Sequence, residues 1–254
     1  LLPPMPPPTE EDVHEALRKM GPARSSLASG VHEEEPRASL ALLVRVRTIG
    51  DADCAALASL LTAARLSVLT SIDLSHNLVG DSGAAALGRA LACGAPALAK
   101  LSLHENAIGD AGLTALADAL CPGGSPGLTH LRFTFNRVGD AGAAGLARAW
   151  RRGGCQQLVE LQAGCNRIGS AGLAALVEQL HGVPDLNLLS LGSAMGGNCV
   201  DDDGAHLLVK ALRMNGLLRS PLTVRLMYNP ISPRAAALLR EVEQDCGPQV
   251  RVSF

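Results

Sequence analysis

Few of the side chains that carry chemistry in proteins stand at catalytic spacings in this chain. The sequence has no His-Glu-x-x-His helix, no Gly-x-Ser-x-Gly turn and no paired Cys/His spacing of the zinc-binding kind. Those patterns would supply a metal-bound water, an activated serine or a structural metal site. Residues 164–170 come nearest to a phosphate-binding loop but lack its lysine. The sequence therefore predicts no catalytic residue, no cofactor and no enzymatic activity.

Two groups of polar residues could bind a cation. His76, His104 and His130 fall near the inner face of consecutive predicted strands, where imidazoles could bind a metal or transfer a proton. Each stands at a different distance from the Asn that follows it, which favours a polar rim over one converging site. Residues 201–203 are three aspartates, but their spacing does not match a calcium loop, and Asp202 stands where a helix needs its N-cap. We therefore predict no metal site.

The composition favours a protein that binds neither nucleic acid nor membranes. The 254 residues carry 22 basic and 24 acidic side chains, a formal net charge of −2. This balance argues against binding to the nucleic-acid backbone, which requires a basic surface. No apolar run is long enough to span a bilayer, so membrane insertion is not expected. Because only 2% of the residues are aromatic, Leu, Val, Ile and Ala must build the core.

An internal repeat dominates the sequence. The string Leu-x-x-Leu-x-Leu-x-x-Asn-x-Ile/Val-Gly-Asp-x-Gly recurs about every 30 residues. A degraded opening copy has Arg47 in the Asn position. The Asn positions of the four clear copies and the two looser copies that follow are Asn77, Asn106, Asn136, Asn166, Asn198 and Asn229. Seven units thus extend from residue 39 to about residue 245.

Each position of the repeat predicts a structural role. The alternating Leu-x-Leu favours a short strand, and the Asn side chain can hydrogen-bond backbone groups in the following turn, forming a ladder from unit to unit. The Asp stands where an N-cap is wanted, and the Gly two residues later suits close packing. Pairs of large apolar residues four positions apart then predict a helix whose apolar face covers the sheet.

This pattern resembles the ribonuclease-inhibitor class of leucine-rich repeats, found in the ribonuclease inhibitor, NOD-like receptor sensor domains, the Ran GTPase-activating protein and a dynein regulatory complex subunit. The resemblance implies an α/β fold: a curved solenoid with parallel strands on the concave face and helices on the convex face. We assign residues 39–254 to this domain, with a C-terminal cap. Residues 1–38 are assigned to a Pro-rich arm, a short amphipathic helix and a linker.

Two segments depart from the repeat, and each has two readings. The helix expected in residues 9–20 either seals the open end of the solenoid or docks onto another protein. Residues 192–197 form a Gly-rich insertion before Asn198. This insertion is either a binding loop at the edge of the sheet or a loop insertion that the fold tolerates and that has no binding role.

The predicted function is that of a non-catalytic scaffold or adaptor, which binds a partner protein through the concave face and edge loops. Exposed aromatic and Arg side chains dominate interface energies. The candidate partner-binding residues are therefore Arg132, Phe135, His104, Arg225 and Tyr228. Phe135 has a second reading, in which it packs into its turn.

Two alternative functions and a location follow from the resemblance and the cysteines. The alternatives are a GTPase activator similar to the Ran-specific one and the sensor domain of a larger receptor. Seven cysteines without paired spacing suit free thiols in a reducing compartment. The resemblance implies a cytoplasmic location, in a cytoskeletal or ciliary assembly.

Overall fold

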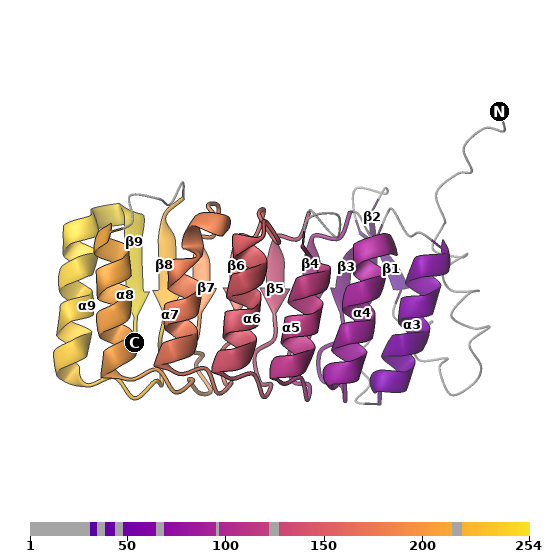
Figure 1. Ribbon diagram of the computed structural model, residues 1–254, viewed down its shortest axis with the longest axis horizontal. Helices are drawn as coiled ribbons and strands as arrows, with labels where there is room; N and C mark the ends of the chain where they lie inside the picture. The colour runs from indigo at the N-terminus through magenta and orange to yellow at the C-terminus, as the bar shows by residue number, and fades with distance from the viewer. Residues whose placement is uncertain are drawn as a thin grey trace.

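The computed structural model describes residues 31–34, 39–43, 48–64, 69–94, 97–121, 127–214 and 220–254. The proline arm, the helix expected in residues 9–20 and Arg47 lie outside these ranges. From β2 (Ser39–Leu43) onward, strands and helices alternate along the described chain (Figure 1). Their bounds are β1 Val31–Glu34, β2 Ser39–Leu43, α3 Asp51–Ala64, β3 Leu69–Asp73, α4 Asp81–Gly94, β4 Lys100–Ser102, α5 Asp110–Ala119, β5 His130–Arg132, α6 Asp140–Arg151, β6 Glu160–Gln162, α7 Ser170–Glu178, β7 Leu188–Ser190, α8 Asp202–Met214, β8 Leu222–Arg225, α9 Pro233–Cys246 and β9 Val250–Ser253.

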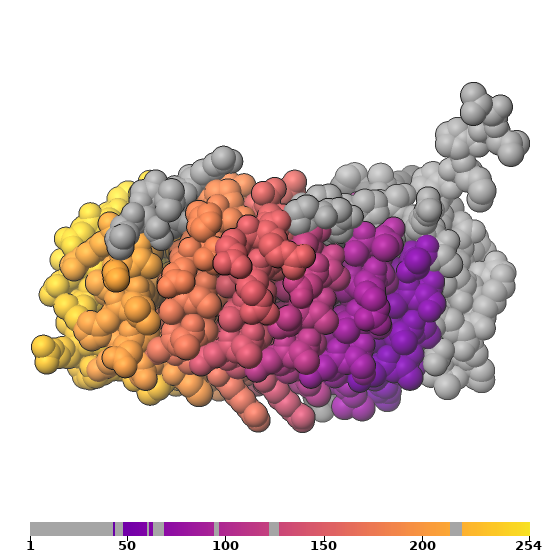
Figure 2. All heavy atoms as spheres, viewed as in Figure 1, coloured from indigo at the N-terminus to yellow at the C-terminus, as the bar shows by residue number. Residues whose placement is uncertain are grey.

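The strands form one sheet in which spatial order follows sequence order. Within the described residues the sheet has nine strands, and β2 to β9 pair in parallel. The helices lie side by side on one face of this sheet, and their packed outer surface runs the length of the molecule (Figures 1 and 2). The structure confirms the predicted α/β solenoid. No helix in the described ranges has the length and apolarity needed to cross a bilayer.

Two strands were not expected from the sequence. Val31–Glu34 falls in the predicted linker, but it pairs antiparallel with β2 at the first edge of the sheet. At the other edge, β9 adds a parallel strand beyond the last repeat unit. Val250 and Val252 are buried whereas Arg251 is exposed, which is the alternation of a half-buried strand. The two strands occupy the open edges of the repeat sheet, where backbone groups would otherwise lack partners.

The core lies between the sheet and the helices, as the apolar positions predict. The paired apolar residues of the first six units are at most 4% exposed: Leu57, Leu61, Leu87, Leu91, Leu116, Leu120, Leu146, Trp150, Leu176, Leu180, Leu208 and Leu212. Leu120 directly follows α5, and Leu180 lies in the 3-10 helix η2, Leu180–Gly182, which follows α7. In α9 the pair is Leu239, which is fully buried, and Glu243, which is only partly buried. There the Arg240 guanidinium lies 4.7 Å from the centre of the Phe254 ring, so the last helix also contacts the chain end.

The repeat Asn side chains bridge neighbouring units. Asn136 accepts a hydrogen bond from the backbone N–H of Ile108, in the preceding unit, at 2.9 Å. Its amide group donates to the carbonyl oxygens of Leu103, in the preceding unit, and Phe133, in its own unit, both at 2.9 Å. Asn77, Asn106, Asn166, Asn198 and Asn229 likewise accept from a backbone N–H of an earlier unit. We call these six residues the Asn ladder.

The sequence suggested that each repeat Asp caps its own helix. In the structure the repeat Asp residues instead bond to the helix start of the next unit. Gly109 is the N-cap of α5, without a side-chain hydrogen bond. Asp110 instead accepts from the backbone N–H groups of Gly139, at 2.6 Å, and Gly142, at 2.9 Å, at the start of α6. Asp51 and Asp140 make the same two bonds to the next unit. Asp81 accepts from one N–H there, that of Gly109, and Asp202 from that of Ser232. These carboxylates therefore form a second ladder on the helix side of the sheet.

The second ladder perturbs the acidity of its first member. Burial acts to raise the pKa of Asp51, but hydrogen bonds from the Ser82 hydroxyl and the Gly80 and Gly83 N–H groups outweigh it. The pKa of Asp51 is therefore held below its usual value.

Asn136→Ala tests the Asn ladder. The substitution removes the acceptor of Ile108 N–H and a donor to two carbonyl oxygens, so it should lower the free energy of unfolding by about 1–3 kcal/mol. Urea unfolding followed by circular dichroism measures this loss. Asn187→Ala is the matched control, because the Asn187 side chain is exposed and outside the ladder. Equal stability of the two variants would refute the bridging role.

Gly142→Ala tests the contact between the Asp ladder and the helix start. Alanine normally stabilises a helix relative to glycine by about 0.5–1 kcal/mol. Here a Cβ would lie 2.7 Å from Asp110 Oδ1 and 3.0 Å from its backbone Cα. We therefore expect a loss of about 1–3 kcal/mol from overpacking. Gly50→Ala, where nothing lies within 4 Å of the new methyl group, should change stability little in the same unfolding assay.

Candidate functional site

The face of the sheet turned away from the helices, here called the sheet face, presents side chains in regular columns. The strand register aligns one residue per strand along its length. This central column contains Asp73, Ser102, Arg132, Gln162, Ser190 and Arg225. Asp73 and Ser190 are buried, whereas Arg132 and Arg225 are exposed. The column is polar and of mixed charge.

The residue just before the ladder Asn adopts an unusual backbone conformation in five of the six units that have such an Asn. His76, Glu105, Phe135, Cys165 and Tyr228 all have φ between +49° and +59°. This left-handed region is rarely adopted by residues other than Gly, Asn and Asp. The turns nevertheless continue the inter-unit hydrogen bonding, for example from His76 N–H to the carbonyl of His104 at 2.8 Å. Large side chains are thus held in a row, here called the turn row, along the carboxyl edge of the sheet.

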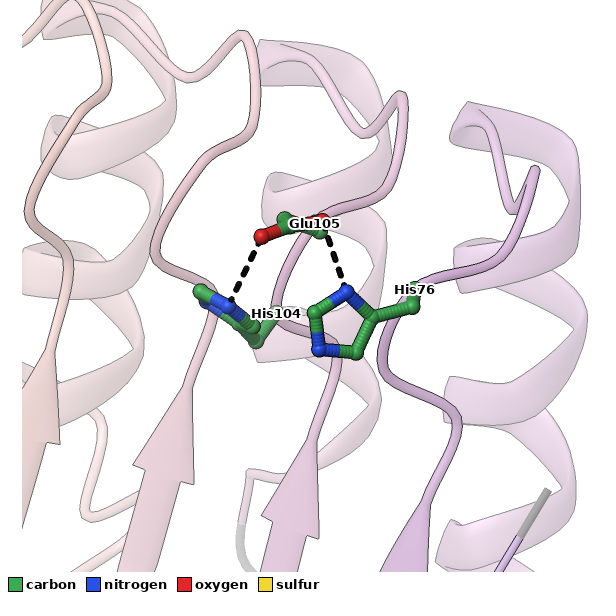
Figure 3. A group of neighbouring side chains, drawn as sticks. All are labelled: His76, His104 and Glu105. Atoms are coloured by element: carbon green, nitrogen blue, oxygen red, sulfur yellow. Dashed lines mark hydrogen bonds and ion pairs between the residues drawn. The ribbon is translucent and has the colours of Figure 1, made fainter. Parts of the chain in front are cut away.

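His76, His104 and Glu105 converge on the sheet face (Figure 3). His76 Nδ1 lies 2.6 Å from one carboxylate oxygen of Glu105, and His104 Nε2 lies 3.4 Å from the other. The two imidazole rings meet edge to face, with their centres 5.1 Å apart. Each of the three side chains remains partly exposed, between 30% and 37%.

This convergence corrects the prediction that the three histidines form only a dispersed rim. His76 stands one residue before its ladder Asn, whereas His104 stands two residues before the next one. The two residues meet because the backbone N–H of His76 pairs with the carbonyl of His104 in the neighbouring unit. His130 lies apart from this cluster. Its Nδ1 is 2.8 Å from the hydroxyl of Thr129, and its Nε2 is 4.0 Å from Glu160. Sequence spacing alone compares residues within units and gives no signal for this contact.

A shallow polar hollow adjoins the cluster. It encloses about 270 Å³ and is lined by Ser75, His76, Ser102, His104, Arg132, Thr134 and Gln162. Partial burial lowers the pKa of His104 despite the opposing carboxylate of Glu105. Partial burial also lowers the pKa of His130, against the effect of Glu160. Both effects favour the neutral imidazole, which offers a lone pair on one ring nitrogen.

The candidate partner-binding residues fall into two groups. Arg132 and His104 line the hollow, and Phe135 contacts His104. Arg132 is paired with Glu160 at 2.8 Å, and the Phe135 ring meets the His104 ring edge to face at 5.5 Å. Arg225 and Tyr228 lie further along the sheet, in unit seven. Tyr228 is 70% exposed. Phe135 is half-buried, so its side chain contributes to the fold as well as to the surface.

The Gly-rich insertion is closely packed against the last unit. A Cβ on Gly192 would lie 2.2 Å from the carbonyl oxygen of Met227, and a Cβ on Gly197 would lie 2.1 Å from that of Tyr228. Residues Ser193 and Gly196 close the loop by backbone hydrogen bonds. At its tip Met195 is 78% exposed. The sequence reasoning did not single out Met195, which joins Tyr228 as an exposed apolar side chain at this end of the molecule.

The other acidic candidates have structural roles. Ser170 replaces the repeat Asp of unit five, and its hydroxyl donates to Asp201 at 2.5 Å. Asp201 in turn accepts from the N–H of Gly204 in α8. Asp202 accepts from the N–H of Ser232. The three consecutive aspartates therefore belong largely to the helix-capping network.

Comparison with known proteins supports the repeat. A family model described as Leucine Rich repeat matches residues 65–88, 98–117 and 125–147. No curated protein matches the chain. Among solved structures, the chain is similar to Leiomodin-1 Actin-Binding Site 2, with 17% sequence identity and a TM-score of 0.36. That match covers 52% of this chain and 73% of the leiomodin chain, and it carries no conclusion about function.

Proposed function

We propose that this chain, a leucine-rich repeat protein, is a non-catalytic scaffold that binds a partner protein through the sheet face and its carboxyl edge. The observation that carries the proposal is the turn row. Five successive or near-successive turns hold a large or chemically active side chain at the same place, each on a backbone fixed by the Asn ladder. A rigid row of this kind is preorganised for binding, because little side-chain order has to be gained on association.

The exposed residues of unit seven are the best-suited anchors. Tyr and Arg are enriched among the residues whose truncation costs most in protein interfaces. Tyr228 is largely exposed, and Arg225, the last residue of β8 and three residues before Tyr228, is also exposed. Within the described residues the side chain of Arg225 has no hydrogen bond or ion pair, so its guanidinium is available to a partner. Arg132, in contrast, already has a partner in Glu160.

Met195 extends this surface. Its tip position and 78% exposure place a flexible thioether on the insertion that packs against Tyr228. Methionine adapts to irregular partner surfaces at low cost. We therefore assign the insertion to the binding edge, the first of the two readings that the sequence left open.

The proposed setting is the cytoplasm, in a cytoskeletal or ciliary assembly. It is supported only by the repeat class that the sequence resembles. We propose that the chain binds other proteins and that it neither binds nucleic acid nor inserts into membranes. The near-neutral net charge and the mixed polarity of the central column support this proposal.

Tyr228→Ala should weaken partner binding about 30-fold, because loss of an aromatic anchor commonly costs about 2 kcal/mol. Arg225→Ala should act in the same direction, and Phe135→Ala should have a smaller effect because its ring packs on His104. The partner is first recovered with the full chain as bait and identified by mass spectrometry. Calorimetry with the purified partner then gives each dissociation constant.

Arg148→Glu, on the exposed face of α6, is the control and should leave the affinity unchanged. Circular dichroism confirms that each variant is folded. If deletion of residues 1–20 abolishes binding while the sheet-face variants bind normally, the partner docks on the N-terminal arm instead. Loss of binding only in the helix-face variant would also refute the proposal.

A further inference from the structure

We propose that His76, His104 and Glu105 form a binding site for one divalent transition-metal ion, with Zn²⁺ as the ion that best fits the donors. This inference goes beyond the scaffold function and does not depend on it. Two imidazole nitrogens and one carboxylate are a ligand set that zinc accepts when a fourth position remains open. Mg²⁺ and Ca²⁺ prefer oxygen ligands, and so the two histidines disfavour them.

The donor atoms already lie at nearly the required separations. One ligand atom from each of the three residues can be chosen so that all lie within 4.8 Å of one another. In a tetrahedral site with bonds of about 2.0–2.1 Å, the donors stand about 3.3 Å apart. His104 Nε2 lies 3.4 Å from Glu105 Oε1, close to that separation, and His76 Nδ1 lies 2.6 Å from the other oxygen, Oε2. The side chains must therefore rotate so that one carboxylate oxygen and both imidazoles can face the same ion. Small rotations of three partly exposed side chains are enough to admit an ion.

The backbone that carries the ligands is fixed before any ion binds. His76 N–H donates to the carbonyl of His104 at 2.8 Å, and Asn77 N–H donates to that of Glu105 at 3.1 Å. Asn77 and Asn106, which follow the ligands, hold both turns through the Asn ladder. A metal site requires ligands whose positions are set by the scaffold rather than by the ion, and this arrangement supplies them.

Groups around the ligands also suit a cation. The carboxylate of Asp73 acts on His104 in addition to that of Glu105. A divalent ion bound by the two histidines and Glu105 would compensate the charge of these two carboxylates.

The hollow beside the cluster leaves room for a fourth ligand. Its lining residues near the histidines, Ser75, Ser102 and Thr134, are polar and small. A water molecule, or a side chain of a bound protein, can therefore complete the coordination. The Phe135 ring also packs edge to face against the His104 ring.

Calorimetric titration of the full chain with ZnCl₂ under reducing conditions tests the proposal. The expected result is one high-affinity ion per chain. Outer partners of metal ligands are themselves worth about 10–100-fold in affinity, so removal of a ligand by His104→Ala or Glu105→Gln should weaken binding by at least about tenfold. His130→Ala is the matched control: it removes another half-buried histidine of the sheet face and should bind as the parent chain does.

Co²⁺ substitution separates this site from the cysteines, of which Cys93 and Cys199 are exposed. Coordination by His and Glu gives visible d–d bands without the intense ultraviolet band of a thiolate ligand. Circular dichroism checks folding, and His76→Gln provides a further ligand variant if one of the others does not fold. No binding, unchanged affinity in the ligand variants, or a thiolate band would each overturn the proposal. Because the isolated chain is used, none of these results bears on partner binding.

Discussion

The hydrogen bonds of the ladder Asn side chains are the constraint on which the rest of the structure depends. Most strands of the repeat are three or four residues long, so the chain soon enters turns whose N–H and C=O groups would otherwise be buried without partners. An amide side chain offers both a donor and an acceptor at one position. Asn136 uses both: its oxygen accepts from one unit, and its nitrogen donates to two. Alanine or an acid at this position would satisfy only part of that requirement.

The Asp ladder solves the complementary problem on the helix side. The first turn of a helix exposes only N–H donors, and a carboxylate, which only accepts, matches them. The starts of α4, α5, α6 and α7 each receive a carboxylate from the unit before them, which ties these helices together as the Asn residues tie the turns. The Gly at the third helical position keeps this approach possible, since a Cβ there would meet the carboxylate. Where Ser170 replaces the Asp, its hydroxyl oxygen accepts only from the N–H of Asp201, and Asp201 caps its own helix through the N–H groups of Asp203 and Gly204.

Sequence reasoning succeeded where the repeat itself carries the information and failed where contacts cross between units. The Leu and Asn spacing predicted the strands, the helices and the buried pairs, because periodicity determines which face of an element is apolar. The same spacing placed Asp110 correctly at a helix start but could not show which unit's N–H groups it binds. The spacing also did not predict the contact between His76 and His104. It gives each residue's distance from the Asn of its own unit but not which residues of neighbouring units lie side by side. β9 has only Val250 and Val252 as its signal, which is too short an alternation to stand out.

The turn row shows how a regular fold can carry irregular chemistry. A left-handed conformation costs a residue other than glycine about 1 kcal/mol, and unit six has glycines at the corresponding point. The fold alone would thus be served better by glycine in every turn. The chain instead holds His76, Glu105, Phe135, Cys165 and Tyr228 there, in turns that the next residue, the ladder Asn, fixes by its own hydrogen bonds. Because the Asn stabilises the turn whatever precedes it, the side chain of the turn row can vary without loss of the architecture. The stability of the repeat and the chemistry of its turns are therefore determined by adjacent but separate residues.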